Sequence, residues 1–360
     1  EQQPASEQGR ASGDACQALL ARVLLYWASP LNNPTNDRQR WTDAANAAWA
    51  LIDKRYRLID DYGDVFLSWN DEVIFARAFS QANSTEFATW AGRSGDNGQG
   101  VITPTQNMVN AYEMQATGLR PYVEQADGTL TLNAGSGYDP ANPYAGRDPR
   151  FYASVLYDGS VWMGRETEIF YGGLDEANSK VSSQPWNATQ TGYYLRKFLD
   201  ESIPPTGSSV KMTSPWIFMR YAEVLLNYAE AKFEEGDEPT ARFYLKQVRQ
   251  RPGVNMPEVK DSGDALRERI HNERRVELAF EHHRFFDVRR WKVAERTETF
   301  PLQKMVITKD ETSGTKNYDI QILKNREFRS YQLLLPIPRT EIEKSLNTLE
   351  QNDGYVKTAE

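Results

Sequence analysis

The chain has 360 residues, of which 39% are hydrophobic, and its 42 basic and 50 acidic side chains give a net charge of −8. This length allows a sizeable hydrophobic core. The acidic excess argues against nucleic acid as the main partner, because binding to nucleic acid depends on neutralising phosphates. No apolar run approaches the roughly eighteen residues that a membrane-spanning helix needs.

The single cysteine, Cys16, cannot form a disulfide within the chain, so the cysteine content does not indicate a compartment. Its neighbours predict a helix, within which we expect Cys16 to behave as a small apolar residue. We do not expect it to carry a lipid, because no charged segment and apolar stretch precede it. The chain begins at Glu1 without a methionine, and we expect an N-terminal portion with any export signal to lie outside this sequence.

Apolar residues at helical spacing predict a first pair of helices over residues 12–27 and 41–54. The predicted apolar stripes are formed by Leu19, Val23 and Tyr26 in the first helix and by Ala44, Ala48 and Leu51 in the second. The linker over residues 29–40 is rich in proline and asparagine, which favour turns. Two antiparallel helices joined by a polar loop are therefore predicted.

A second pair of helices is predicted over about residues 217–233 and 239–248. Gly236 suits the position just after the first of these helices, and the proline that opens the second suits a first helical turn. A third helical stretch is predicted to begin at Asp264 as its N-cap and to continue towards Trp291.

Residues 80–210 differ from these stretches because they are rich in glycine, polar turn formers and aromatic residues. Long irregular segments inside a domain are usually functional or disordered, and the aromatic content argues against disorder. We predict a mainly α fold in which tetratricopeptide-like helical hairpins frame a loop-rich insertion with short strands. The helical parts are placed at about 9–57 and 214–295, and an irregular C-terminal segment at about 296–360.

Five blocks of sequence resemble the SusD/RagB family. Gly146–Phe151 looks like the family's DPRF segment, and Thr191–Phe198 resembles its GYY-x-RKF strand. Met219–Ala231 matches its RYAEVLL-x-YAEA helix nearly letter for letter. Glu273–Trp291 resembles its ERR-x-ELAFE block, and Leu335–Tyr355 resembles its LPIP…QNxGY ending.

This resemblance implies a single SusD-like domain, an α/α superhelix that is truncated at its N-terminus in this chain. It also implies a non-catalytic protein on the extracellular face of the bacterial outer membrane, held there by an N-terminal lipid anchor that is not in this chain. Such a protein would capture an oligosaccharide or polysaccharide and deliver it to a partner SusC-like TonB-dependent transporter. Peptides are the alternative cargo, as in the RagB branch. A glycoside hydrolase and a helical scaffold that binds only protein are the remaining alternatives.

Three carboxylates four residues apart, Glu273, Glu277 and Glu281, could suggest a catalytic site. We interpret them as partners of arginines on adjacent helices, because structural ion-pair networks resemble such sites. For a hydrolase Asp148 and Glu166 could be nominated, but many other pairs fit equally well. We therefore predict no catalytic residues.

No cofactor and no metal ligands are predicted, because the three histidines lack the spacing of a zinc site. Calcium bound by the loops rich in aspartate, asparagine and glycine stays open as an alternative, although no EF-hand spacing supports it.

Binding of sugars requires flat aromatic faces, together with amides, carboxylates and arginines for the hydroxyl groups. The loop-rich insertion offers both kinds of group. The residues predicted to contact ligand are Trp90, Arg93, Asn97, Trp162, Tyr171 and Trp186. Trp90 and Trp186 lie among glycine, serine and asparagine and are the best candidates for exposure, whereas Trp162 is the best candidate for the core.

Overall fold

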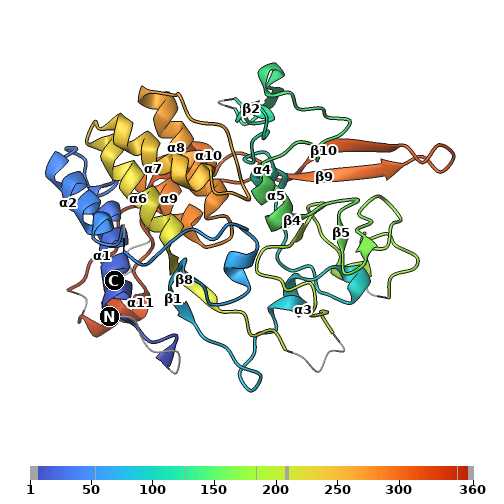
Figure 1. The fold of residues 1–360 in the computed structure, drawn as a ribbon, viewed down its shortest axis with the longest axis horizontal. Helices are drawn as coiled ribbons and strands as arrows, with labels where there is room; N and C mark the ends of the chain where they lie inside the picture. The colour runs from blue at the N-terminus through green and yellow to red at the C-terminus, as the bar shows by residue number, and fades with distance from the viewer. Residues whose placement is uncertain are drawn as a thin grey trace.

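The computed structural model describes residues 7–52, 54–125, 127–183, 185–206, 211–346 and 348–355. The long helices gather in one half of the molecule, and loops with short strands form the other half (Figure 1). The helical half contains α1 (Gly13–Ala28), α2 (Arg38–Trp49), α6 (Tyr221–Glu234), α7 (Glu238–Arg249), α8 (Gly263–Glu277), α9 (His283–Arg290) and α10 (Ala294–Thr297). The shorter helices elsewhere are α3 (Phe87–Ala91), α4 (Gln106–Val109), α5 (Pro149–Ser154) and α11 (Arg339–Lys344).

The described strands form two-stranded antiparallel pairs rather than one sheet. The pairs are β1 (Val73–Arg77) with β8 (Trp216–Arg220), β2 (Tyr122–Glu124) with β3 (Leu130–Leu132), β4 (Val155–Leu156) with β7 (Tyr194–Leu195), β5 (Val161–Trp162) with β6 (Arg165–Glu166), and β9 (Leu302–Lys309) with β10 (Lys316–Lys324). The fold is therefore mainly α with short strands, as the sequence predicts. Among the described helices, none is both long and apolar enough to cross a membrane.

Local signals in the sequence set the helix ends. The Ser12 hydroxyl accepts a hydrogen bond from the Ala15 N–H at 3.1 Å and starts α1. Gly236, at φ +87°, follows α6 and returns its N–H to the Phe233 carbonyl at 2.8 Å, which confirms its predicted position. The Asp237 carboxylate then caps α7 through the Thr240 N–H.

The two hairpins pack with α2 against both α1 and α6, and α6 against α7. The buried face of α1 is formed by Ala15, Ala18, Ala21, Leu25 and Ala28. The prediction that Leu19 and Val23 belong to the buried stripe is wrong, since they are 49% and 53% exposed. Small alanine side chains let the helix axes approach closely, so the larger residues face outward. Cys16 lies within α1 and is exposed rather than buried.

The stretch expected to run unbroken from Asp264 to Trp291 is divided into α8 and α9. Ser262, not Asp264, occupies the N-cap position of α8. Phe280 and His282 adopt left-handed φ values of +64° and +67°, which end the α-helical course between the two helices.

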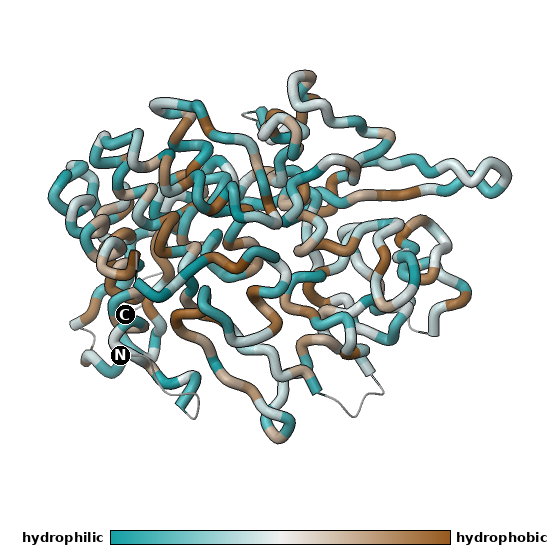
Figure 2. The backbone as a smooth tube through the Cα atoms, viewed as in Figure 1, coloured by the Kyte–Doolittle hydropathy of each residue, from teal (hydrophilic) through white to brown (hydrophobic). Residues whose placement is uncertain are grey.

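The C-terminal segment expected to be irregular contains the longest described strands, β9 and β10. Their hairpin projects away from the helical half, alongside the loop-rich half, and its tip is hydrophilic (Figures 1 and 2). Met305 and Ile307 alternate with less buried neighbours on β9, the pattern of a strand with one face on the core. The Asp310 carboxylate accepts hydrogen bonds from Thr312 and Ser313 and shapes the turn.

Most aromatic residues of the loop-rich half fill its own core. Tyr112, Phe151, Tyr193 and Tyr194 have almost no exposed surface and belong to one hydrophobic cluster. The DPRF segment supplies part of this core, because the Asp148 carboxylate caps α5 and directs Phe151 inward. The insertion is therefore an ordered body beside the helical half.

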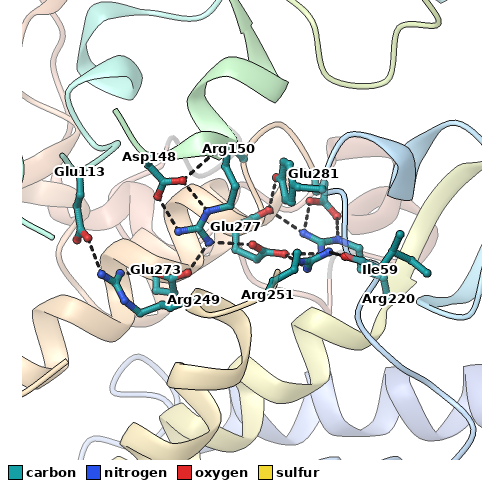
Figure 3. A network of polar contacts seen from close by, with 12 residues as sticks. Ile59, Glu113, Asp148, Arg150, Arg220, Arg249, Arg251, Glu273, Glu277 and Glu281 are labelled. Carbon is teal, nitrogen blue, oxygen red and sulfur yellow. Dashed lines mark hydrogen bonds and ion pairs between the residues drawn. The ribbon is translucent and has the colours of Figure 1, made fainter. Parts of the chain in front are cut away.

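A buried network of ion pairs joins the two halves (Figure 3). Glu277 on α8 accepts hydrogen bonds at 2.8 Å from Arg150 of α5, Arg220 of β8 and Arg251. The Glu277 side chain is fully buried, and so are those of Arg150 and Arg251. Burial alone would raise the pKa of Glu277, but the three arginine charges outweigh it and hold this pKa far below its usual range.

Glu273 and Glu281 extend the same network on either side. Glu273 pairs with Arg150 and with Arg249, the latter at 2.7 Å, while Glu281 pairs with Arg220 and Lys197. Burial opposes ionisation of Glu281, yet Arg220 and Lys197 lower its pKa to about 2. All three carboxylates are therefore engaged as partners of basic side chains.

Candidate functional site

The first predicted site segment is a closed loop that follows α3. The carbonyl of Trp90 accepts a hydrogen bond from the Val101 N–H at 2.9 Å, and the carbonyl of Thr89 accepts one from the Gln99 N–H at 2.8 Å. These bonds bring both ends of the loop together. The Trp90 side chain stays 51% exposed at its rim.

Arg93 holds this loop from inside. Its side chain is fully buried, and its guanidinium donates to Asp96 at 2.7 Å, to the Thr167 hydroxyl at 2.8 Å and to the Trp162 carbonyl at 2.8 Å. The structure places Trp162 in the core, 5% exposed. Arg93 and Trp162 therefore support the loops in this conformation, and neither side chain faces solvent.

A second ion-pair group lies next to Arg93. Arg165 bridges Asp96 at 2.9 Å and Asp175 at 2.7 Å. The other oxygen of Asp175 accepts a hydrogen bond from the Glu168 N–H. Ion pairs with hydrogen-bond geometry therefore hold the loop after α3 against the segment around residues 165–175.

Trp186 stands on a neighbouring loop, in the short 3-10 helix Pro185–Asn187. Gly100 approaches this helix so closely that a Cβ atom there would lie 2.4 Å from the Asn187 carbonyl oxygen. The Ser183 hydroxyl donates to the Asn97 amide oxygen at 2.9 Å. Trp186 is 74% exposed and Asn97 is exposed. The structure thus brings together the loops that carry Trp90, Asn97 and Trp186.

Tyr171 occupies a different place. Its backbone N–H donates to the Ile307 carbonyl of β9 at 2.8 Å, so it lies beside the projecting hairpin. Its side chain is 66% exposed. Of the six predicted residues, four are therefore exposed and two are buried beneath them.

A cavity of about 800 Å³ lies elsewhere in the molecule and was missed by sequence reasoning. Its wall is mainly apolar and includes the aromatic side chains of Phe198, Trp216, Phe280, Phe286 and Phe300. Arg275 and Arg284 also line it. The consecutive pair Phe285–Phe286 on the otherwise charged helix α9 is the sequence signal that could have indicated it, because both side chains are partly exposed, at 43% and 47%.

The nominated hydrolase carboxylates do not form a pair at a surface. Asp148 is buried, caps α5 and binds Arg150, so it cannot face a glycosidic bond in this conformation, whereas Glu166 is exposed on β6. In the part of the chain that the structure describes, no group of three or more histidine, cysteine, aspartate or glutamate side chains could hold a metal ion. Calcium binding stays an untested prediction.

A frame of helical hairpins beside an ordered, loop-rich body with exposed indole rings defines a scaffold of the kind that presents binding residues on loops. A model of the SusD family matches residues 71–355 of the chain. A SusD-like protein of Formosa agariphila is 32% identical over 98% of this chain and 61% of its own length, and another is 26% identical over 68% of this chain and 44% of its own length. The chain belongs to the SusD family.

Solved structures agree with this assignment. A SusD-like protein from Bacteroides fragilis superposes with a TM-score of 0.76 at 29% identity, over 98% of this chain and 67% of that protein. A SusD-like carbohydrate-binding protein from the same species gives 0.72 at 26% identity, over 94% of this chain and 65% of that protein. The chain thus spans about half to two thirds of the length of these relatives.

Proposed function

We propose that this chain is the glycan-binding part of a cell-surface protein that captures oligosaccharides. The observation that carries the proposal is the exposure of Trp90 and Trp186 on two loops in contact with each other. Indole faces suit the apolar faces of sugar rings, and Asn97 beside them offers an amide for hydroxyl groups. Membership of the SusD family and a carbohydrate-binding structural neighbour support the same class of ligand.

These loops are attached rigidly, which favours binding without a change in loop conformation. The pairs of Arg93 with Asp96 and of Arg165 with Asp96 and Asp175 hold the loop backbones in place before ligand arrives. A surface that is already ordered loses less conformational entropy when it binds. Weak contacts with successive sugar units would then suffice for capture while leaving release fast.

We further propose, from family membership, that the whole protein is non-catalytic and is held by a lipid on the extracellular face of the outer membrane. It would deliver its cargo to a SusC-like TonB-dependent transporter. Co-purification of the native protein from solubilised outer membranes tests this assembly. Recovery without a transporter of that class would contradict it.

The binding site is tested with a glycan array followed by calorimetry on the glycans that bind. Trp90→Ala and Trp186→Ala are each expected to weaken affinity about tenfold, the loss typical of an aromatic anchor. Trp27→Ala is the matched control, because Trp27 is 51% exposed on α1 in the helical half. Its affinity is expected to equal that of the unchanged protein.

Three results would contradict the proposal. If the Trp90→Ala, Trp186→Ala double variant still binds glycans with unchanged affinity, the binding site lies elsewhere. Binding of a peptide mixture with no binding to any glycan would favour the peptide-binding branch of the family. Release of shorter products from a bound glycan would instead indicate hydrolysis.

A further inference from the structure

The cavity of about 800 Å³ is separate from the surface of Trp90 and Trp186, neither of which lines it. Its walls come from the segment between α3 and α4, from the turn between α8 and α9, and from the start of β9. Aromatic and aliphatic side chains form most of the wall, among them Leu278 and Met108. This size falls within the range of about 300–1,000 Å³ for small-molecule sites.

One end of the cavity carries two arginines that have few ion-pair partners among the described residues. The Arg275 guanidinium donates to the Asn107 carbonyl at 2.8 Å, and no described carboxylate lies within 4.0 Å of it. Arg284 has one described carboxylate within 4.0 Å, that of Glu298 at 3.9 Å. Glu298 is already bound by Arg326 at 2.7 Å.

The balance of charge along the wall is also positive. Arg275, Arg284 and Arg326 face two carboxylates, Glu124 and Glu298. Arg274 also lines the cavity, but it is matched by Asp287 at 3.3 Å. This local excess lies in a protein whose net charge is −8.

The fully buried arginines differ from Arg275, which is only partly buried, in the partners that they have. Arg150, Arg220 and Arg251 each meet two or more carboxylate groups (Figure 3). Arg147, which has no carboxylate partner, is held instead by three backbone carbonyls. Arg275 has one carbonyl. Burial, and next to it the charge of Arg284, lowers the pKa of Arg275 to about 9, and burial also lowers the pKa of Arg284.

A smaller cavity of about 70 Å³ adjoins this end and shares Arg275 and Arg284 with the large one. Arg120 and Arg296 also line it, together with the carboxylates Glu124 and Glu268, and Arg296 pairs with Glu268 at 3.7 Å. An apolar chamber thus leads to a compact polar niche with several guanidinium groups. Guanidinium groups bind carboxylates through paired hydrogen bonds, so an anion placed here could pair with Arg275 and Arg284.

We propose that this cavity is a second binding site, which takes a small amphiphilic carboxylate with its apolar body against the aromatic wall and its carboxylate between Arg275 and Arg284. The apolar part of the wall suits the apolar body of such a ligand, and the arginines at one end suit its carboxylate. The inference goes beyond glycan capture and does not depend on it.

The site is tested by calorimetry on the whole chain with dodecanoate, and with dodecanol as the neutral analogue of equal length, both at monomeric concentrations. Dodecanoate is expected to bind at least about tenfold more tightly than dodecanol, the effect of one charge-assisted contact. Arg284→Gln is expected to remove this preference and leave dodecanol binding unchanged. Arg284→Lys, which keeps the charge, is expected to retain part of it.

Thr103→Trp adds bulk to the cavity wall and is expected to weaken both ligands, which places them inside the chamber. Arg339→Gln, on an exposed arginine of α11, is the control and is expected to change neither. Circular dichroism checks that each variant is folded. Arg275→Gln replaces Arg284→Gln if that variant does not fold. Absence of dodecanoate binding, equal affinity for dodecanol, or full binding by Thr103→Trp would overturn the proposal.

Discussion

Replacing Glu277 by glutamine should destabilise the protein more than any exposed charge change. The side chain is fully buried, and three arginines donate to its carboxylate at 2.8 Å (Figure 3). Glutamine keeps the volume and one carbonyl acceptor, but its amide N–H groups then face guanidinium donors. Breaking a buried ion pair in this way costs about 3–5 kcal/mol.

The other partners of the three arginines keep this loss within that range. Arg150 retains Asp148, and both Arg220 and Arg251 retain Glu72. No guanidinium is therefore left without a carboxylate, so the three bonds are not lost in full. For a chain of 360 residues, a loss of about 4 kcal/mol corresponds to a fall in melting temperature of roughly 5 °C.

Urea unfolding followed by tryptophan fluorescence measures the change. Glu343→Gln is the control, because Glu343 pairs with Arg339 at 2.7 Å on an exposed helix. An exposed pair of this kind contributes about 0.3–0.5 kcal/mol. If Glu277→Gln loses no more free energy of unfolding than Glu343→Gln, the network does not hold the two halves together as we argue.

Two further predictions concern a glycine and a histidine. Gly100→Ala should destabilise the protein by about 1 kcal/mol more than Gly164→Ala and should weaken glycan binding. Both positions have positive φ, but only the new Cβ at residue 100 meets a carbonyl, that of Asn187. Urea unfolding of the two variants measures the difference. Burial lowers the pKa of His271 to about 3, so the unfolded chain takes up this proton first as pH falls, and stability present above about pH 6.5 is lost towards pH 3. His271→Phe, which can keep the stacking on Trp291, should lose less stability than the unchanged protein between pH 6.5 and pH 4. His282→Gln, at an exposed position, is the control and should behave like the unchanged protein. Equal losses in all three proteins would contradict the assignment.

Periodicity and capping residues were enough to predict the helical half. Ala44, Ala48 and Leu51 are buried as predicted, and Gly236 ends its helix. The stripe of α1 was wrong because hydrophobicity does not tell which face approaches a neighbour, and alanines allow the closer approach. The break between α8 and α9 depends on left-handed residues that are not glycine, Phe280 and His282, which carry no local sequence signal.

The binding surface was predictable only in part, for a related reason. Trp90, near the end of α3, and Trp186 lie close in sequence to glycine, serine and asparagine, and this context indicated their exposure. Arg93 has the same local context, yet its guanidinium turns inward because partners distant in sequence, Thr167 and Trp162, provide acceptors for it. Tertiary hydrogen bonds of this kind decide whether an arginine stabilises the fold or contacts a ligand. Their donors and acceptors lie in different segments, so the local sequence does not predict them.

This distinction separates the interior network from the proposed second site. A guanidinium that meets two or more carboxylates, such as Arg150, has its charge matched within the fold, which offsets its cost of burial. Arg275 donates to one carbonyl, has no described carboxylate within 4.0 Å and lies next to the positive charge of Arg284. An anion that enters the cavity pairs with this guanidinium, whereas a neutral molecule of the same shape does not. A higher affinity for an anion than for a neutral ligand of the same shape therefore distinguishes a binding site from a cavity that only excludes water.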